Sequence, residues 1–263
     1  MKIIVLVKQV PDSTEIRVDK VTGTLIRAGV PSIINPDDLA GVEEALKIKE
    51  TTPDVKVTVV SMGPPQAKDM LKELYARGVD ECVLISDRAF AGADTCATSS
   101  TLAAAIEKIG YDFIIAGRQA IDGDTAQVGP QTAERLNIPQ VTYVDQFIKI
   151  AEDKLTVRKS LEDTEEIIEV KLPCLLTTLS GMNTPRYMNC NDIVDSFNKE
   201  VKVMTFADLD IPSEKVGLAG SPTKVHKTFT KDVTAETETY DLPAEEAAKL
   251  IAKTLKEKQI ITK

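Results

Sequence analysis

Residues 112–136, DFIIAGRQAIDGDTAQVGPQTAERL, decide the fold class of this chain. Residues 112–116 form an apolar run with the length of a buried strand. The residues that follow are glycine, Asp, Thr and Gln with almost nothing to bury, which predicts a loop, and the segment ends on a helical pattern. A strand, a polar loop and a helix in this order indicate a βαβ unit, in which consecutive strands lie parallel.

The same alternation occupies the part of the chain before this segment. It predicts strands at residues 2–7, 55–61 and 81–86, and helices at residues 35–50, 64–77 and 94–109. Residues 16–19 and 24–27 flank a Thr-Gly turn and predict a small hairpin. We therefore expect an α/β fold: a parallel, Rossmann-like sheet with right-handed crossovers and helices on both faces.

The second half of the chain has a different pattern. Residues 141–150, 154–159 and 165–172 predict an antiparallel addition, and residues 174–179 predict one more buried strand. Residues 183–242 are rich in loops and poor in apolar clusters, so we expect a C-terminal extended arm that lies on a partner subunit. An amphipathic helix at residues 244–258 follows it. The length of 263 residues allows one large domain or two small ones, and we place the α/β domain at residues 1–182 and the arm with its helix at residues 183–263.

Composition excludes several classes of function. Lys and Arg number 32 against 41 Asp and Glu, and the net charge of −9 disfavours binding to nucleic acid or anionic membranes. The apolar runs have the length of strands and the N-terminus leads directly into one, so we expect no membrane insertion and a cytoplasmic protein. Four widely spaced cysteines support neither a zinc site nor a disulfide framework, and we expect them to be small buried side chains. His226 lies in a polar segment that offers no partner for a catalytic base.

Four loops are predicted to meet at one rim of the sheet. Residues 7–12, 61–64, 87–94 and 117–129 follow strands, and all are rich in small or polar residues. In an open parallel sheet, ligands bind outside the carboxyl ends of the strands. Small residues let a ligand approach the backbone, and amides at a helix start bond phosphate oxygens. This pattern suits a nucleotide.

Residues 117–129 offer individual candidates for such a site. Asp124 is placed to cap a helix, which leaves the amides of the next three residues near its open end. Asp122 can accept hydrogen bonds from ribose hydroxyls, and Arg118 can offset phosphate charge. Pro130 allows either a helix that starts at Asp124 and bends, or a later start with Pro130 at the first helical position.

A purely structural interpretation of these loops stays open. The GDGD-like loop is also typical of an ordinary turn with a cap, Asp94-Thr95 of a plain helix N-cap, and Asn35-Pro36 of a turn and cap. Neither G-x-G-x-x-G nor G-x-x-x-x-G-K-[ST] occurs, so any site differs from the dinucleotide fingerprint and from the P-loop. We find no Ser/His/Asp, Cys/His or paired-carboxylate arrangement, and a flavin or nicotinamide would supply chemistry that these side chains cannot.

Residues 117–127, GRQAIDGDTAQ, closely resemble the signature of the electron transfer flavoprotein β subunit. The resemblance covers nearly the whole chain, because residues 5–10 (VLVKQV), Asn35-Pro36, residues 61–64 (SMGP), residues 171–173 (KLP) and residues 185–187 (PRY) occur in the family's order and spacing. In that family the β subunit pairs with an α subunit that carries FAD, and the β pocket holds either AMP or a second FAD. Residues 1–182 would then bind the nucleotide or flavin, and the arm would pack on the α subunit.

The resemblance implies a set of cofactor-binding residues in the rim loops and at neighbouring helix starts. They are Leu6, Val7, Asn35, Pro36, Asp37, Asp38, Ser61, Met62, Gly63, Asp94, Thr95, Gly117, Arg118, Gln119, Ala120, Ile121, Asp122, Gly123, Asp124, Thr125, Ala126, Gln127 and Val128. It implies no catalytic side chain and no metal ligand.

Two short segments point to one branch of the family. Residues 90–95 (FAGADT) and 219–223 (AGSPT) look like the electron-bifurcating members, whose β subunit binds FAD. In those members NADH reduces the β flavin, one electron goes to ferredoxin or flavodoxin, and the other passes through the α flavin to a flavin-containing dehydrogenase. One alternative is a non-bifurcating β subunit with AMP in the same pocket. Another is a stand-alone adenine-nucleotide-binding sensor, although a monomer would leave the arm with little to pack on.

One departure from the family concerns docking. In well-studied members, the loop after the Pro-Arg-Tyr motif presents an apolar anchor and a lysine-rich helix to acyl-CoA dehydrogenases. Here Cys190 stands at the anchor position, and residues 191–200 contain a single lysine. The identity of the partner dehydrogenase is therefore open. A plain surface helix, with Ile193, Val194 and Phe197 against the body, is the alternative interpretation.

Overall fold

The computed structural model describes residues 1–12, 17–18, 25–26, 31–224, 226 and 238–261. The chain divides into two compact units, Met1–Thr228 and Phe229–Lys263. Among the described residues, no helix combines the length and the apolar character needed to cross a bilayer.

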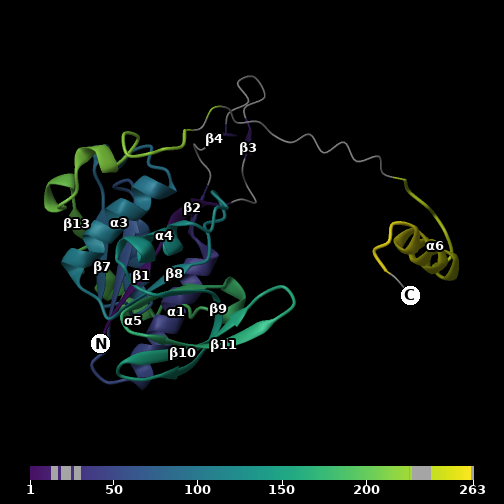
Figure 1. The fold of residues 1–263 in the computed structure, drawn as a ribbon, viewed down its shortest axis with the longest axis horizontal. Helices are drawn as coiled ribbons and strands as arrows, with labels where there is room; N and C mark the ends of the chain where they lie inside the picture. The colour runs from purple at the N-terminus through teal and green to yellow at the C-terminus, as the bar shows by residue number, and fades with distance from the viewer. Residues whose placement is uncertain (13–16, 19–24, 27–30, 225, 227–237, 262–263) are drawn as a thin grey trace. The chain divides into compact units, whose positions relative to one another are not determined.

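The first unit is built around one nine-stranded sheet with the order β11-β10-β9-β12-β8-β1-β6-β7-β13 (Figure 1). Its parallel part consists of β1 (Lys2–Leu6), β6 (Lys56–Met62), β7 (Glu81–Ile85), β8 (Phe113–Gly117), β12 (Cys174–Thr178) and β13 (Lys202–Met204). β9 (Gln140–Ile150) pairs parallel with β12 and then antiparallel with β10 (Lys154–Ser160), which pairs antiparallel with β11 (Glu165–Lys171). The predicted α/β class and its antiparallel addition are confirmed.

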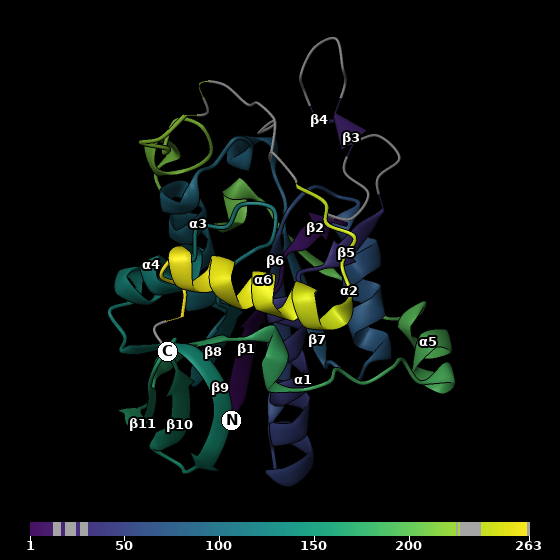
Figure 2. The same ribbon diagram turned by 90° about the vertical axis from the view of Figure 1, so that its right-hand side faces the viewer.

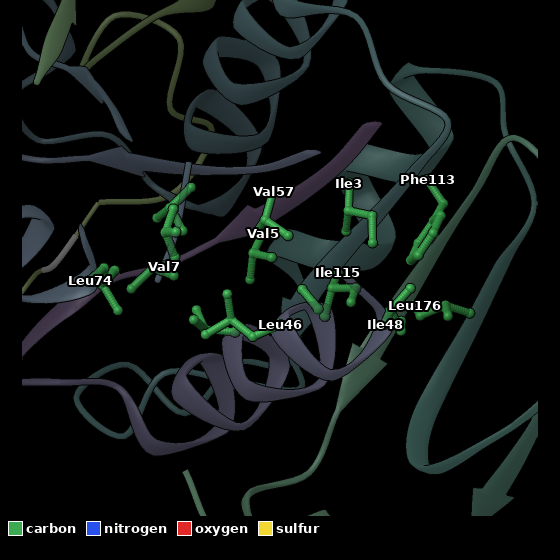
Figure 3. Packing of buried hydrophobic residues seen from close by; sticks show 14 of the residues in the cluster. Ile3, Val5, Val7, Leu46, Ile48, Val57, Leu74, Phe113, Ile115 and Leu176 are labelled. Atoms are coloured by element: carbon green, nitrogen blue, oxygen red, sulfur yellow. The ribbon is translucent and has the colours of Figure 1, made fainter. Parts of the chain in front are cut away.

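Two separate apolar cores cover the two faces of the sheet, because successive side chains of a strand point to opposite faces. Ile3 and Val5 of β1 belong to the core with α1 (Pro36–Thr51) and α2 (Ala67–Ala76), whereas Ile4 and Leu6 belong to the core with α3 (Thr95–Ile109) and α4 (Val128–Arg135). Figure 3 shows the first of these cores, with Leu46 of α1 beneath the strands. Helices therefore cover both faces, as predicted.

Several small elements complete the structure. β2 (Gln9–Pro11) pairs with β5 (Ser32–Ile34), and β3 (Arg17–Val18) pairs with β4 (Leu25–Ile26) at the position of the predicted hairpin. The remaining short helices are η2 (Arg88–Phe90), η3 (Ser180–Met182), α5 (Cys190–Ser196), η4 (Phe206–Asp208) and η5 (Ser213–Lys215). The sequence does not predict β2, β5 or β13, because three-residue strands are too short to show a period.

Residues 183–224 lie on the α/β body, whereas the sequence predicts them as part of an arm. β13 pairs with β7 and extends the sheet, α5 contacts α2 (Figure 2), and Val201, Leu209 and Val216 are buried. These few apolar side chains are enough to hold the segment in place, because it packs on a core that the α/β body already forms. The second unit contains α6 (Ala244–Glu257), in which no side chain is buried.

The structure corrects two smaller expectations. Cys82 and Cys174 are buried as predicted, but Cys96 is only half-buried and Cys190 is exposed at the start of α5. Val194 and Phe197 are 64% and 70% exposed, so they are not buried against the body as the surface-helix interpretation expected; Nζ of Lys72 on α2 lies 5.8 Å from the ring centre of Phe197. The positions of these side chains were not predictable, because the helix is too short for its buried face to be identified from the sequence.

Candidate functional site

A cavity of about 880 Å³ lies at the carboxyl ends of β1, β6, β7 and β8, on the face covered by α3 and α4. Ligand pockets in proteins span roughly 300–1,000 Å³, so this cavity has the size of a site for a whole cofactor. Leu6, Val60, Met62 and Ala116 form its apolar floor. The loop at residues 117–129 lines one side, and the loop that contains η2 lines the other.

Most of the predicted site residues line this cavity, and the others lie outside its lining. Those that line it are Leu6, Val7, Asp38, Met62, Asp94, Thr95, Gly117, Arg118, Gln119, Ala120, Gly123, Thr125, Ala126, Gln127 and Val128. Those that do not are Asn35, Pro36, Asp37, Ser61, Gly63, Ile121, Asp122 and Asp124. A cofactor-binding role for each of them stays a prediction.

The cavity also includes residues outside the predicted set. They are Lys8, Val60, Pro64, Phe90, Gly92, Ala93, Thr98, Leu102, Ala116, Gly129 and Thr223. Several of them belong to the four rim loops, so the sequence could have predicted them as lining residues. Val60, Leu102 and Ala116 lie inside regular elements, where the sequence does not reveal which face turns toward a ligand.

Asn35 shapes the cavity without lining it. Its side chain is fully buried, its Nδ2 donates to the carbonyl oxygen of Gln119 at 2.8 Å, and its Oδ1 accepts from the amide of Ile121 at 3.1 Å. The residue thus fixes the backbone of the loop after β8. The structure does not show the side-chain cap that the turn-and-cap interpretation expected.

Asp38, on the first turn of α1, joins two loops of the cavity. One carboxylate oxygen accepts from the amide of Lys8 at 2.8 Å and the other from the amide of Gly117 at 3.0 Å. Burial raises the pKa of Asp38 to about 7, although its hydrogen bonds with Asn35, Lys8 and Gly117 lower it. The close approach requires glycine at position 117, since a Cβ there would lie 2.1 Å from Oδ1 of Asp38.

Asp37 performs a similar task on the neighbouring strand. Its Oδ1 accepts from the amide of Ser180 at 2.9 Å, and its carbonyl oxygen accepts from the hydroxyl of Thr178 at 3.0 Å. Its Oδ2 lies 3.5 Å from Nε of Arg118, whose guanidinium stacks 5.8 Å from the ring centre of Tyr143. Asp37 therefore orients a cation that lines the cavity.

The start of α4 differs from both predicted arrangements, because the helix starts after Asp124 and Pro130 is not its first residue. The helix begins at Val128, and Asp124 has a φ of +52° and accepts a hydrogen bond from Nε2 of Gln119 instead of capping the helix. The prediction that Asp124 is the N-cap is therefore wrong. Pro130 is the third helical residue, where its missing N–H costs no intrahelical bond.

Side chains from different elements also meet around the mouth of the cavity. Nζ of Lys8 lies 2.6 Å from Oδ1 of Asp122, and the hydroxyl of Thr95 donates to Oε1 of Gln127 at 2.9 Å. The carboxylate of Asp94 caps α3, with Oδ1 accepting from the amide of Ala97 at 3.0 Å, so the cap interpretation of Asp94 is confirmed.

The arrangement supports binding more directly than side-chain catalysis. The loop of small residues after β8 and the starts of α3 and α4 line the cavity, and Lys8 and Arg118 supply positive charge. Such a set of groups suits a phosphate-containing ligand above an apolar floor. His226 is exposed and is not among the lining residues.

Comparison with known proteins connects this geometry to a family. A family model described as the electron transfer flavoprotein domain matches residues 22–209. The chain is 55% identical to the electron transfer flavoprotein subunit beta of Clostridium acetobutylicum over 261 residues, which cover 99% of this chain and 100% of that protein.

Two further relatives carry names of larger assemblies. One is subunit CarD of the caffeyl-CoA reductase-Etf complex of Acetobacterium woodii, 50% identical over 99% of this chain and 100% of that protein. The other is the acryloyl-CoA reductase electron transfer subunit gamma of Anaerotignum propionicum, 48% identical over 88% of each chain. On the extent of these matches, the chain belongs to the electron transfer flavoprotein family and to its β-subunit branch.

Proposed function

We propose that this chain binds FAD in the rim cavity and serves as the β subunit of an electron-bifurcating electron transfer flavoprotein. NADH is the electron donor in this proposal. Ferredoxin or flavodoxin takes one electron, and a flavin-containing dehydrogenase takes the other through the FAD of the α subunit. The names of the relatives from Acetobacterium woodii and Anaerotignum propionicum, which refer to complexes with CoA-ester reductases, support this assignment.

The width of the cavity is the observation that carries the choice of FAD. The lining extends from the loop over β8 to the loop over β7, and β1 and β6 lie between these two strands in the sheet. Adjacent strands lie about 4.8 Å apart, so three spacings give a width of about 14 Å. A mononucleotide such as AMP needs only part of this width, whereas a dinucleotide uses both sides.

The two sides also differ in chemistry in the way that FAD requires. The β8 side offers Lys8 and Arg118 together with the backbone of lining residues such as Gln119, Thr125 and Ala126, and these groups suit ribose and phosphates. The β7 side offers Phe90, Ala93 and Leu102, which suit a flat aromatic ring. When bound, FAD supplies the one-electron and two-electron redox chemistry, and the protein residues bind, orient and shield it.

The C-terminal part of the chain supports a heterodimer. No side chain of α6 is buried, and Ile251 on this helix is 60% exposed. A short helix of this kind gains little stability by itself and needs another surface for its apolar face. We propose that residues 238–261, which include α6, pack on the α subunit, and that the protein is cytoplasmic, in keeping with its four free cysteines.

Cofactor release from the purified heterodimer tests this function. Denaturation is expected to release two FAD per heterodimer and essentially no AMP, whereas one FAD with one AMP would identify the non-bifurcating branch. The variant Ala93→Leu narrows the β7 side and is expected to reduce the yield to one FAD. Ala207→Leu, at an exposed position outside the lining and outside residues 216–223, is the matched control and is expected to retain both.

A further inference from the structure

A segment far along the chain forms part of the wall of the cavity. Residues 216–223 fold against η2 and the loop that follows it, and the amide of Leu218 donates to the carbonyl oxygen of Ala91 at 3.0 Å. Gly217 has a φ of +53°, and a Cβ there would lie 2.1 Å from the carbonyl oxygen of Ala89. The backbones of the two segments therefore approach as closely as a glycine allows.

Ser221 joins the two segments through hydrogen bonds of its buried hydroxyl. Its side chain is buried; its hydroxyl donates to the carbonyl oxygen of Gly217 at 2.7 Å and accepts from the amide of Asp94 at 2.8 Å. Both hydrogen-bonding roles of the hydroxyl are used, one within the segment and one across to α3. Alanine at this position would leave the partly buried amide of Asp94 without this acceptor.

Thr223 makes the second attachment. Its amide and its hydroxyl both donate to Oδ2 of Asp94, at 3.0 and 2.7 Å. The other oxygen of Asp94 caps α3 through the amide of Ala97. One carboxylate thus connects residues 216–223 with the first turn of the helix that lines the cavity.

The segments that Ser221 and Thr223 hold together form the β7 side of the cavity. Phe90, Gly92, Ala93, Asp94 and Thr223 all line it. Neither Ser221 nor Gly217 lines the cavity, so their influence on a ligand must be indirect. The two cations of the lining, Lys8 and Arg118, by contrast, follow β1 and β8.

We infer that Ser221 and Thr223 are positioning residues that set the shape of the cavity where the ring system of a dinucleotide lies, and so favour FAD over AMP. This inference rests on the proposed function. Its physical basis is that the two side chains hold the backbone at residues 88–94 in the position that leaves room for a flat ring. AMP, bound through the β8 side, does not contact this wall.

Two measurements on the complete heterodimer test the inference. The double variant Ser221→Ala/Thr223→Val is compared with the wild type for the affinity of the β cavity for FAD and for AMP by titration calorimetry, after the exchangeable cofactor has been removed. Loss of the hydroxyl bonds of Ser221 and Thr223, with the backbone bonds of the segment left in place, is expected to weaken FAD about tenfold and AMP less than about twofold. Hydrogen exchange of the amides at residues 88–94, measured without added cofactor, is expected to become about tenfold faster.

Control variants separate the possible outcomes. Thr223→Ser retains both donors to Asp94 and is expected to behave as the wild type, as is Ser213→Ala, an exposed serine of the same region. Unchanged hydrogen exchange in the double variant would show that these bonds do not hold the wall. Equal weakening of FAD and AMP would overturn the assignment of this wall to the ring. A wild-type complex that binds AMP but not FAD would contradict the proposed function and this specificity role, while hydrogen exchange would still report whether the attachment exists.

Discussion

Asp38 and Gly117 are 79 residues apart in the sequence, and in the structure a carboxylate oxygen of Asp38 accepts a hydrogen bond from the amide of Gly117 at 3.0 Å. The other oxygen accepts from the amide of Lys8. A single buried side chain on α1 therefore holds the ends of β1 and β8 together beneath the cavity. The geometry of the two rim loops after β1 and β8 therefore depends on whether Asp38 is protonated.

The stability of the first unit is expected to depend on the protonation of Asp38. Burial raises its pKa in the folded protein to about 7, above the value of about 3.9 for an unfolded chain. The folded state therefore retains a proton that the unfolded state releases between these two values. Its contribution to the free energy of unfolding is complete below about pH 4 and is lost as the pH rises toward about 7.

The variant Asp38→Asn tests this dependence, because asparagine does not titrate. Urea unfolding at several values between pH 4 and 8 should show a smaller fall in stability with pH for the variant. The difference in slope is expected to approach at most about 1.4 kcal/mol per pH unit. Parallel profiles for the two proteins would mean that Asp38 does not take up a proton in this range.

Gly117→Ala is expected to be destabilising by about 1–3 kcal/mol. The added Cβ would lie 2.1 Å from Oδ1 of Asp38 and 2.8 Å from its backbone nitrogen, so α1 or β8 must move. Gly123→Ala is the matched control in the same loop, because a Cβ there meets nothing within 4 Å, and its cost is expected to stay within about 0.5 kcal/mol. Urea unfolding measures both, and equal values would show that the contact at Gly117 relaxes freely.

The sequence was sufficient for the central elements of the fold. β8 is predicted at residues 112–116 and observed at Phe113–Gly117, and α3 is predicted at residues 94–109 and observed at Thr95–Ile109. Buried parallel strands are apolar throughout. Gly110 marks the end of α3, because its φ of +77° is a backbone conformation that residues other than glycine rarely adopt. These signals are local, which explains why they can be read without the structure.

The roles of individual site residues were less accessible. The sequence predicts Asn35 and Asp37 as cofactor-binding residues; in the structure they hydrogen-bond the loops after β8 and β12, and neither lines the cavity. The choice between touching a ligand and supporting its loop depends on where each side chain points. This direction follows from the packing of α1 across the sheet, which joins residues that lie far apart in the sequence.

Lys8→Met is expected to weaken nucleotide binding without a comparable loss of stability. Lys8 lines the cavity, and its ion pair with Asp122 joins side chains that are 47% and 31% exposed, so the pair itself contributes less than about 1 kcal/mol to stability. A phosphate near the amine would lose a positive charge in the variant. The affinity of the heterodimer for FAD should fall, and its dependence on salt concentration should become weaker.

Asp122→Asn provides the contrast, because it removes the acid of the pair and leaves the lysine. Its affinity for FAD is expected to stay the same or to increase, since the amine is then free to pair with a phosphate. A loss of affinity as large as that of Lys8→Met would show that Asp122 itself contacts the cofactor, as the sequence predicts.

Glu43 and Arg186 form the attachment of a second surface loop, and its disruption is expected to loosen residues 185–189. The carboxylate of Glu43, whose side chain is only 7% exposed, accepts from the amide of Arg186 at 3.0 Å and from Nε at 2.9 Å. These bonds hold the backbone beside Tyr187, which is 95% exposed. Glu43→Gln lacks the charge and one of the two acceptor oxygens. The variant is expected to lower the free energy of unfolding by about 1–3 kcal/mol. The loss is limited to this range because water can still solvate part of Arg186.

Glu50→Gln is the matched control, because Glu50 also pairs with Arg186 but its side chain is 58% exposed. Solvent screens this pair, so its loss is expected to cost less than about 1 kcal/mol. Urea unfolding gives the two free energies, and hydrogen exchange at residues 185–189 should become faster in Glu43→Gln alone. Equal effects would mean that the exposed pair holds the loop as firmly as the buried one, contrary to what their burial predicts.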